Sequence, residues 1–137
     1  MLYFGRVLID PPLVLAPMAG ITDSPFRRVI REVGGCGLVT MEFLSSEALT
    51  RDIAVEKAKI PFYECERPIS IQVYGSRPAA MAEAARMVED AGAEICDVNM
   101  GCPANKILKG CSGAALMGNF SLAGNIIREI RSAISIP

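Results

Sequence analysis

The chain has 137 residues, of which 51% are hydrophobic, and a net charge of −1. This length suffices for one domain with a core, while the small charge gives no overall field that would attract nucleic acid, so an RNA partner would need a local basic patch. The sequence has no histidine, the commonest general base and metal ligand, and no apolar run approaches the ~20 residues of a membrane helix.

Predicted strands and helices alternate along the first third of the chain. The apolar run Pro12–Met18, closed by proline and glycine, predicts a buried strand. A helix follows, with Ser24 expected as its N-cap, Pro25 at its first position and Gly34 as its C-cap. Its expected apolar face has the spacing i, i+3, i+4, i+7 and consists of Phe26, Val29, Ile30 and Val33.

The alternation continues through the middle of the chain. Gly37–Phe43 predicts a second strand, residues 45–60 predict helix in pieces, and Pro68–Gly75 predicts a third strand. Pro78–Gly92 is the clearest helix, because its acidic and basic residues avoid the face formed by Met81, Ala84, Ala85 and Val88. Glu94–Met100 predicts a fourth strand.

A last helix is expected to start at a Ser121 cap and to carry Leu122, Ile126, Ile127 and Ile130, before a fifth strand that would begin at residues 135–137. Four βα units in succession predict an α/β fold with a parallel sheet. A doubly wound open sheet and a (β/α)8 TIM-type barrel both have this pattern. The barrel needs roughly 250 residues, about twice the length of this chain.

Unusual residues gather where the predicted strands end, which is where α/β folds bind ligands. They are Ala16–Gly20 after the first strand, Glu42 after the second, Gln72 and Tyr74 at the third, and Asn99 with Cys102 after the fourth. Gln72 lies in an otherwise apolar strand and needs a hydrogen-bond partner, either a neighbouring backbone or a flat ligand. Asp97 and Asn99 are two residues apart, so both face the same side of their strand.

Cysteines stand at positions 36, 65, 96, 102 and 111, without the C-x-x-C spacing of zinc sites and redox dithiols. This usage predicts a reduced, cytoplasmic compartment and no metal site. Gly101 and Pro103 frame Cys102 on a rigid, exposed loop. An ordinary thiol, with a pKa of about 8.5, keeps its proton at neutral pH. With no histidine to remove that proton, the sequence favours Cys102 as a general acid over a nucleophile.

Three segments resemble the tRNA-dihydrouridine synthases in wording, order and spacing: LAPMAGITDSPFR, ISIQVYG and DVNMGCPANKILKGCSGAAL. The resemblance implies a flavin-dependent (β/α)8 barrel in which NADPH reduces FMN, a hydride passes to C6 of a tRNA uridine, and Cys102 protonates C5. By motif match, FMN would contact Pro17, Met18, Ala19 and Gln72. Asn99 would hold the uracil or the flavin, and Lys106, beside Lys109, would help to bind RNA.

The family pattern also implies segments that have no counterpart in this sequence, namely the second half of the barrel and a C-terminal helical RNA-binding domain. Residues 1–137 are therefore expected to be the N-terminal half of a flavin-binding catalytic domain, with about four βα units, and to be inactive alone. Two alternatives stay open. One is a flavin barrel of the dihydroorotate dehydrogenase type that acts on a free pyrimidine. The other is a non-catalytic half-barrel that self-associates through sheet edges and apolar surface.

Overall fold

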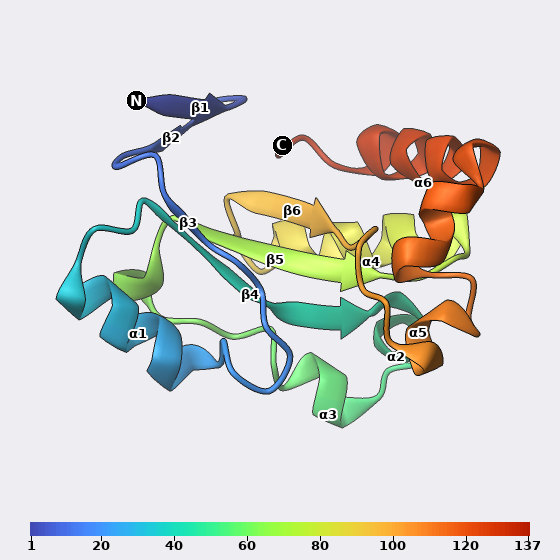
Figure 1. Cartoon of the computed structure of the whole chain (residues 1–137), viewed down its shortest axis with the longest axis horizontal. Helices are drawn as coiled ribbons and strands as arrows, with labels where there is room; N and C mark the ends of the chain where they lie inside the picture. Colours follow the sequence, from blue (N-terminus) through green and yellow to red (C-terminus); the bar gives the residue numbers. More distant parts are fainter.

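The computed structural model describes residues 1–137 and shows an α/β fold built on a four-stranded parallel sheet. The strands lie in chain order, β3 (Val14–Leu15), β4 (Leu38–Ser45), β5 (Ile69–Tyr74) and β6 (Ile95–Val98), as Figure 1 shows. This confirms the predicted parallel sheet. The first strand is much shorter than the run Pro12–Met18 predicted, and β4 extends two residues beyond the predicted end at Phe43.

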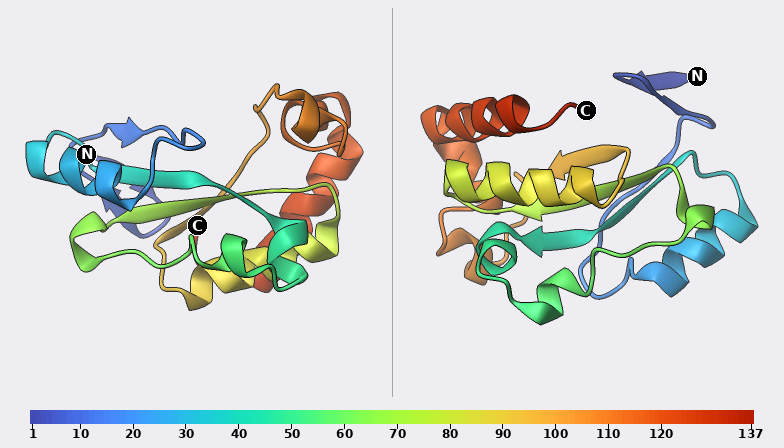
Figure 2. Two further views of the ribbon diagram at one scale, coloured as in Figure 1. Left: turned by 90° about the horizontal axis from the view of Figure 1, so that it is seen from below. Right: turned by 180° about the vertical axis from the view of Figure 1, so that it is seen from behind.

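The helices are α1 (Ser24–Val33), α2 (Ser46–Thr50), α3 (Ala54–Lys57), α4 (Pro78–Asp90), α5 (Asn105–Leu108) and α6 (Phe120–Ala133), with 3₁₀ turns η1 (Glu64–Glu66) and η2 (Gly113–Gly118). Helix α4 packs against both α2 and α6, and α4 and α6 lie side by side along the sheet (Figures 1 and 2). No helix combines the length and the apolar character that crossing a bilayer requires.

The main core lies between the sheet and these helices. Alternate residues of β5, namely Ile69, Ile71 and Val73, are fully buried in it. The predicted apolar face of α4 meets them: Met81, Ala84, Ala85 and Val88 are also fully buried, which confirms that prediction. Because side chains alternate along a strand, Ser70 and Gln72 face the other side of the sheet.

Two predicted helix caps are wrong by one or two residues. Helix α1 is capped by Asp23, whose Oδ1 accepts the N–H of Phe26 at 3.0 Å, and Ser24 is its first residue. Helix α6 is capped by Asn119, whose Oδ1 accepts the N–H of Leu122 at 3.0 Å, upstream of the predicted Ser121. Aspartate and asparagine cap helices as well as serine does, so neighbouring candidates are not separable from residue type alone.

The predicted apolar face of α1 is wrong at two of its four positions, although Ile30 packs against the main core and Phe26 is half-buried. Val29 and Val33 are 55% and 79% exposed, whereas Arg27 is buried. The Nε of Arg27 pairs with Oε2 of the fully buried Glu66 at 2.6 Å. This ion pair turns a charged side chain of the helix inward, which the predicted apolar face did not include.

A β-hairpin that the sequence pattern did not predict covers one end of the sheet. It consists of β1 (Leu2–Phe4) and β2 (Val7–Ile9), paired antiparallel. Ile9 is fully buried and clusters with Leu38 and Ile95, the first residues of β4 and β6. The hairpin therefore closes the amino-terminal end of the sheet and leaves the opposite end for ligands. The carbonyl of Pro137 accepts the N–H of Cys96 at 2.9 Å, so the C-terminal residues lie beside β6 without forming a strand.

Candidate functional site

A bulge shapes the carboxyl end of β4. The pairing register with β5 shifts between Met41 and Leu44, and both of these side chains are buried in the main core. They are three residues apart, whereas a regular strand would return to the same face after two. Glu42 and Phe43 are therefore both available to the opposite face, at the strand end.

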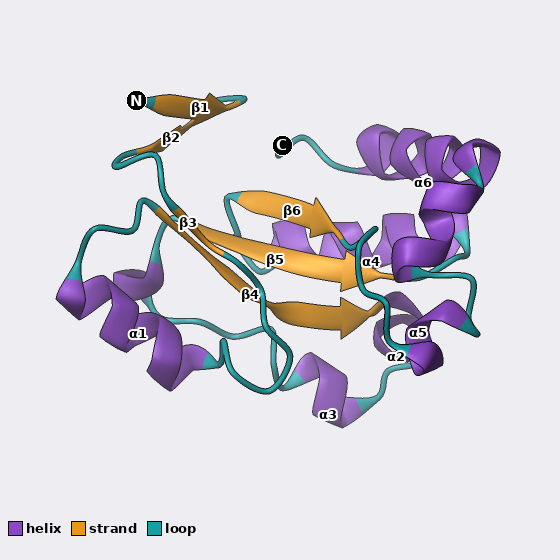
Figure 3. Cartoon of the chain, viewed as in Figure 1, coloured by secondary structure: helices purple, strands orange, loops and turns teal.

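Eight residues line a cavity of about 490 Å³ at this end of the sheet: Pro17, Phe43, Gln72, Val98, Asn99, Met100, Gly101 and Cys102. They come from the loop after β3 and from β4, β5 and β6 with the loop that follows it (Figure 3). Of the predicted site residues, the structure thus brings together Pro17, Gln72, Asn99 and Cys102.

A chain of side-chain hydrogen bonds passes through two residues that line this cavity, Gln72 and Asn99. Gln72 Nε2 donates to Asp97 Oδ2 at 2.6 Å, and Asn99 Nδ2 donates to Gln72 Oε1 at 3.0 Å. Asn99 Oδ1 accepts the backbone N–H groups of Gly101 and Cys102 at 3.2 and 3.0 Å. The parallel register places Gln72 opposite Asp97. Gln72 therefore finds its first partners in neighbouring side chains, and Asn99 acts as a cap for the cysteine loop.

The 3₁₀ turn η2 holds the cysteine loop from its other side. The carbonyl of Cys102 accepts the N–H of Ala114 at 3.0 Å. Gly113 has φ +60°, and a Cβ at this position would lie 2.7 Å from the carbonyl oxygen of Cys102. Only glycine fits this close approach. Cys102 is therefore held between the Asn99 cap and η2, half-buried at the edge of the cavity.

The loop after β3 brings the remaining motif residues close to the cavity without lining it. The N–H of Met18 donates to Thr22 Oγ1 at 3.0 Å, and the N–H of Gly20 donates to Glu42 Oε2 at 2.7 Å. Glu42 thus fixes the loop to the end of β4. Met18 and Ala19 are exposed and are not among the residues that line the cavity.

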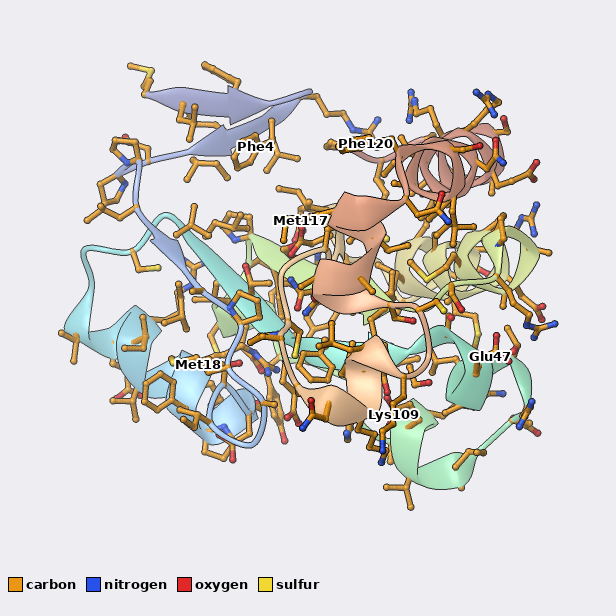
Figure 4. The ribbon with its side chains drawn as sticks, turned by 45° about the vertical axis from the view of Figure 1, so that its right-hand side comes forward. Phe4, Met18, Glu47, Lys109, Met117 and Phe120 are labelled. Carbon is orange, nitrogen blue, oxygen red and sulfur yellow. The ribbon has the colours of Figure 1, made fainter.

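Lys106 lies on α5, and Lys109 follows that helix directly. Both are exposed, neither forms an ion pair, and neither lines the cavity. Figure 4, in which the carboxyl ends of the strands come forward, shows Lys109 on this near side of the molecule. The predicted basic pair therefore stands free for an anionic partner beside the cysteine loop.

A family model described as "Dihydrouridine synthase (Dus)" matches residues 14–137. The chain belongs to the dihydrouridine synthase family. It is 48% identical over 130 residues to a probable tRNA-dihydrouridine synthase of Rhodobacter capsulatus, covering 94% of this chain and 40% of that protein. Its identity to tRNA-dihydrouridine synthase B of Pseudomonas aeruginosa is 37%, over 97% of this chain and 40% of that protein. The chain thus spans about two fifths of the length of these relatives.

Five residues at or beside this cavity were given no role from the sequence. Phe43 lines the cavity only because of the bulge in β4, and it meets Tyr74 edge-on with ring centroids 5.1 Å apart. Val98 and Met100, the chain neighbours of Asn99, add apolar side chains to the lining. Asp97 and Glu42 stood out as strand-end residues, but their partners come from other strands and loops, which spacing along the chain does not show.

A larger hollow of about 660 Å³ lies on the helical side of this family member, near Phe62, Arg67 and Met87. The positive charge of Arg67 in this hollow is already compensated, because Arg67 pairs with Glu64 and Glu94. None of the residues at the strand ends lines it. The smaller cavity, with its amide groups and thiol, is therefore the better candidate for chemistry.

The other thiols differ in environment from Cys102. Burial, with a smaller contribution from the neighbouring Asp97 carboxylate, raises the pKa of Cys96 to about 12, so this thiol stays protonated. All five cysteines are free. No group of three or more side chains that could hold a metal ion is present.

Proposed function

We propose that this chain supplies part of the catalytic domain of an enzyme that reduces uridine in tRNA to 5,6-dihydrouridine. One observation carries the proposal: the capped Cys102 loop and the amides of Gln72 and Asn99 meet at one cavity, in a chain of the dihydrouridine synthase family. The relatives are named tRNA-dihydrouridine synthases, which makes tRNA the molecule that they modify.

We assign the cavity to the ring of the cofactor FMN. Its volume of about 490 Å³ falls within the range of roughly 300–1,000 Å³ that is typical of small-molecule sites. Pro17, Phe43 and Met100 offer apolar contact, while Gln72 and Asn99 offer amide groups to a polar ring edge. When bound, FMN would supply the hydride for C6 of the uracil, with NADPH as its reductant. We assign Pro17 and Gln72 to the ring, and Met18 and Ala19 to contacts from their loop.

Cys102 serves as the general acid in this proposal. Its thiol holds the proton that is delivered to C5, and the Asn99 cap together with η2 keeps the loop in place during the transfer. The target uridine must leave its stack to reach the cavity. Asn99 also has an N–H that can orient the uracil, while Lys106 and Lys109 bind RNA phosphate beside the cavity entrance.

The sheet is proposed to be the N-terminal part of a (β/α)8 barrel in a cytoplasmic enzyme, and the chain to be inactive alone. Its edges support this arrangement, because large apolar residues are exposed at both. Leu13 and Val14 are exposed at β3, and Met117, Phe120 and Ile127 are exposed on η2 and α6, where Figure 4 labels the first two. The same exposed residues favour the second candidate, self-association of the chain through these edges.

The test uses both this chain and a protein with the full length of its relatives. In the longer protein, Cys102→Ala should abolish dihydrouridine formation while FMN stays bound, and Cys65→Ala, at an exposed cysteine that does not line the cavity, should leave activity unchanged. Full activity of Cys102→Ala would sink the assigned role. Turnover of a free pyrimidine without tRNA would instead favour the dihydroorotate dehydrogenase type. Sedimentation velocity of the 137-residue chain measures self-association, and any dihydrouridine synthesis by it would refute inactivity.

A further inference from the structure

The carboxylate of Asp97 lies at the end of the hydrogen-bonded chain that leads through Gln72 and Asn99 to the cysteine loop. We propose that Asp97 is a positioning residue: it fixes the amide orientation of Gln72 and so stabilises the Asn99 cap that holds Cys102. The catalytic consequence rests on the proposed function, but the geometric claim does not.

The argument starts from what each group in the chain is able to donate or accept. An ionised carboxylate only accepts hydrogen bonds, so Asp97 requires the nitrogen of Gln72, not its oxygen, at its side. At the other end, the backbone N–H groups of Gly101 and Cys102 only donate, so they require the oxygen of Asn99. Both ends therefore require the same direction of donation along the chain, from the cysteine loop toward Asp97. The middle bond, in which Asn99 Nδ2 donates to Gln72 Oε1, has this direction.

Removal of the Asp97 carboxylate leaves Gln72 without a good orientation. If Gln72 stays as it is, its Nε2 loses its acceptor while the side chain is only 7% exposed. If the amide flips, its NH₂ group faces the NH₂ group of Asn99, and two donors oppose each other. A buried polar group without a partner is costly in either case. In either case the hydrogen bond between Gln72 and Asn99 is weakened, and Asn99 is the residue whose side chain holds the cysteine loop.

The same polarity decides what the cavity offers to a ligand. Each amide NH₂ has two hydrogens, and the chain uses one from Gln72 and one from Asn99. The second hydrogen of each amide remains for a ligand, and Gln72 Oε1 keeps one free lone pair, whereas Asn99 Oδ1 already accepts two backbone N–H groups. Asn99 therefore offers a ligand only a donor, and Gln72 offers both a donor and an acceptor. With the reverse polarity Asn99 would turn its oxygen toward Gln72 and would no longer cap the cysteine loop. Asp97 therefore acts on ligand preference without lining the cavity itself.

Alkylation of Cys102 in the 137-residue chain tests this role without flavin or tRNA. The rate with iodoacetamide is followed by peptide mass spectrometry, with Cys36 and Cys65 in the same digest as references. In Asp97→Leu, which has no acceptor, Cys102 should react about fivefold faster or more, since the loss of a charge-assisted bond loosens its loop. Asp97→Asn retains an acceptor oxygen and should stay within about twofold of the wild type.

Ser70→Ala is the matched control, because Ser70 faces the same side of the sheet and its buried hydroxyl has no hydrogen-bond partner. It should leave the Cys102 rate unchanged. Equal rates for Asp97→Asn and Asp97→Leu, or acceleration of all cysteines together, would overturn the proposal. If Asp97→Leu does not fold, Gln72→Met breaks the chain at its centre with a side chain of similar shape. A wild-type Cys102 rate in that variant would equally refute the role.

Discussion

The buried ion pair between Arg27 and Glu66 gives the sharpest stability prediction. Glu66 is fully buried, and besides the 2.6 Å bond from Arg27 Nε it accepts Ser24 Oγ at 2.6 Å and the N–H of Tyr63 at 3.0 Å. Glu66→Ala removes all three bonds and leaves a buried guanidinium unpaired. Breaking one partner of a buried pair typically costs ~3–5 kcal/mol, a large share of the ~5–15 kcal/mol that stabilises a domain.

This pair also positions the candidate site. Arg27 Nη1 donates to the carbonyl of Thr22 at 2.7 Å, and Thr22 Oγ1 in turn accepts the N–H of Met18. Loss of the pair should therefore loosen the loop that carries Pro17 in addition to destabilising α1.

Urea unfolding followed by far-UV circular dichroism measures the free energy of unfolding of each variant. Glu66→Ala should lose ~3–5 kcal/mol, whereas the double variant Arg27→Met/Glu66→Leu, which removes both charges, should come within ~2 kcal/mol of the wild type. Ser24→Ala, which removes one hydroxyl from the cluster, should cost only ~1 kcal/mol. A loss below ~1 kcal/mol for Glu66→Ala would refute the reasoning, because an unpaired buried charge cannot be so cheap.

Three further predictions concern single positions. A Cβ at Gly75 would lie 2.0 Å from Ser46 Oγ, so Gly75→Ala should lower the melting temperature at a cost of ~1–3 kcal/mol, and adding Ser46→Ala, which removes an unpartnered hydroxyl, should restore part of it. Hydrogen bonds from the Ser135 hydroxyl and backbone lower the pKa of Glu89 below its ordinary 4.5. The carboxylate therefore stabilises the fold above pH 4.5, and Glu89→Gln should be less stable than the wild type at pH 7. The stabilities of the two proteins should converge as the pH falls through the lowered pKa of Glu89. A constant difference in stability at all pH values would contradict this prediction. With its pKa raised to about 12, Cys96 should resist alkylation of the native chain at pH 8.5 while Cys65 is labelled, and equal labelling would argue against its burial.

Sequence patterns predicted what depends on local periodicity. The apolar face of α4 was predictable because all four of its core residues recur at helical spacing in one continuous segment, and the parallel order of the strands followed from their alternation with helices. The meeting of Pro17, Gln72, Asn99 and Cys102 was predictable from a general rule, that parallel strands present their carboxyl ends at one edge.

What the sequence could not predict depends on contacts between distant segments. Arg27 points inward because it pairs with the fully buried Glu66, which is 39 residues away in the sequence. The periodicity of a helix contains no information about such a distant partner. Phe43 reaches the cavity because one extra residue in β4 shifts the register against β5. A prediction that assumes strict alternation of side chains along the strand cannot include such a bulge. The position of Asp97 on the site's face follows from the alternation along its strand. Its bond to Gln72 follows only from the register between β5 and β6. The residues that line a site can thus be predicted once the ends of the strands are known. The residues that orient them can be predicted only when the pairing register between neighbouring strands is also known.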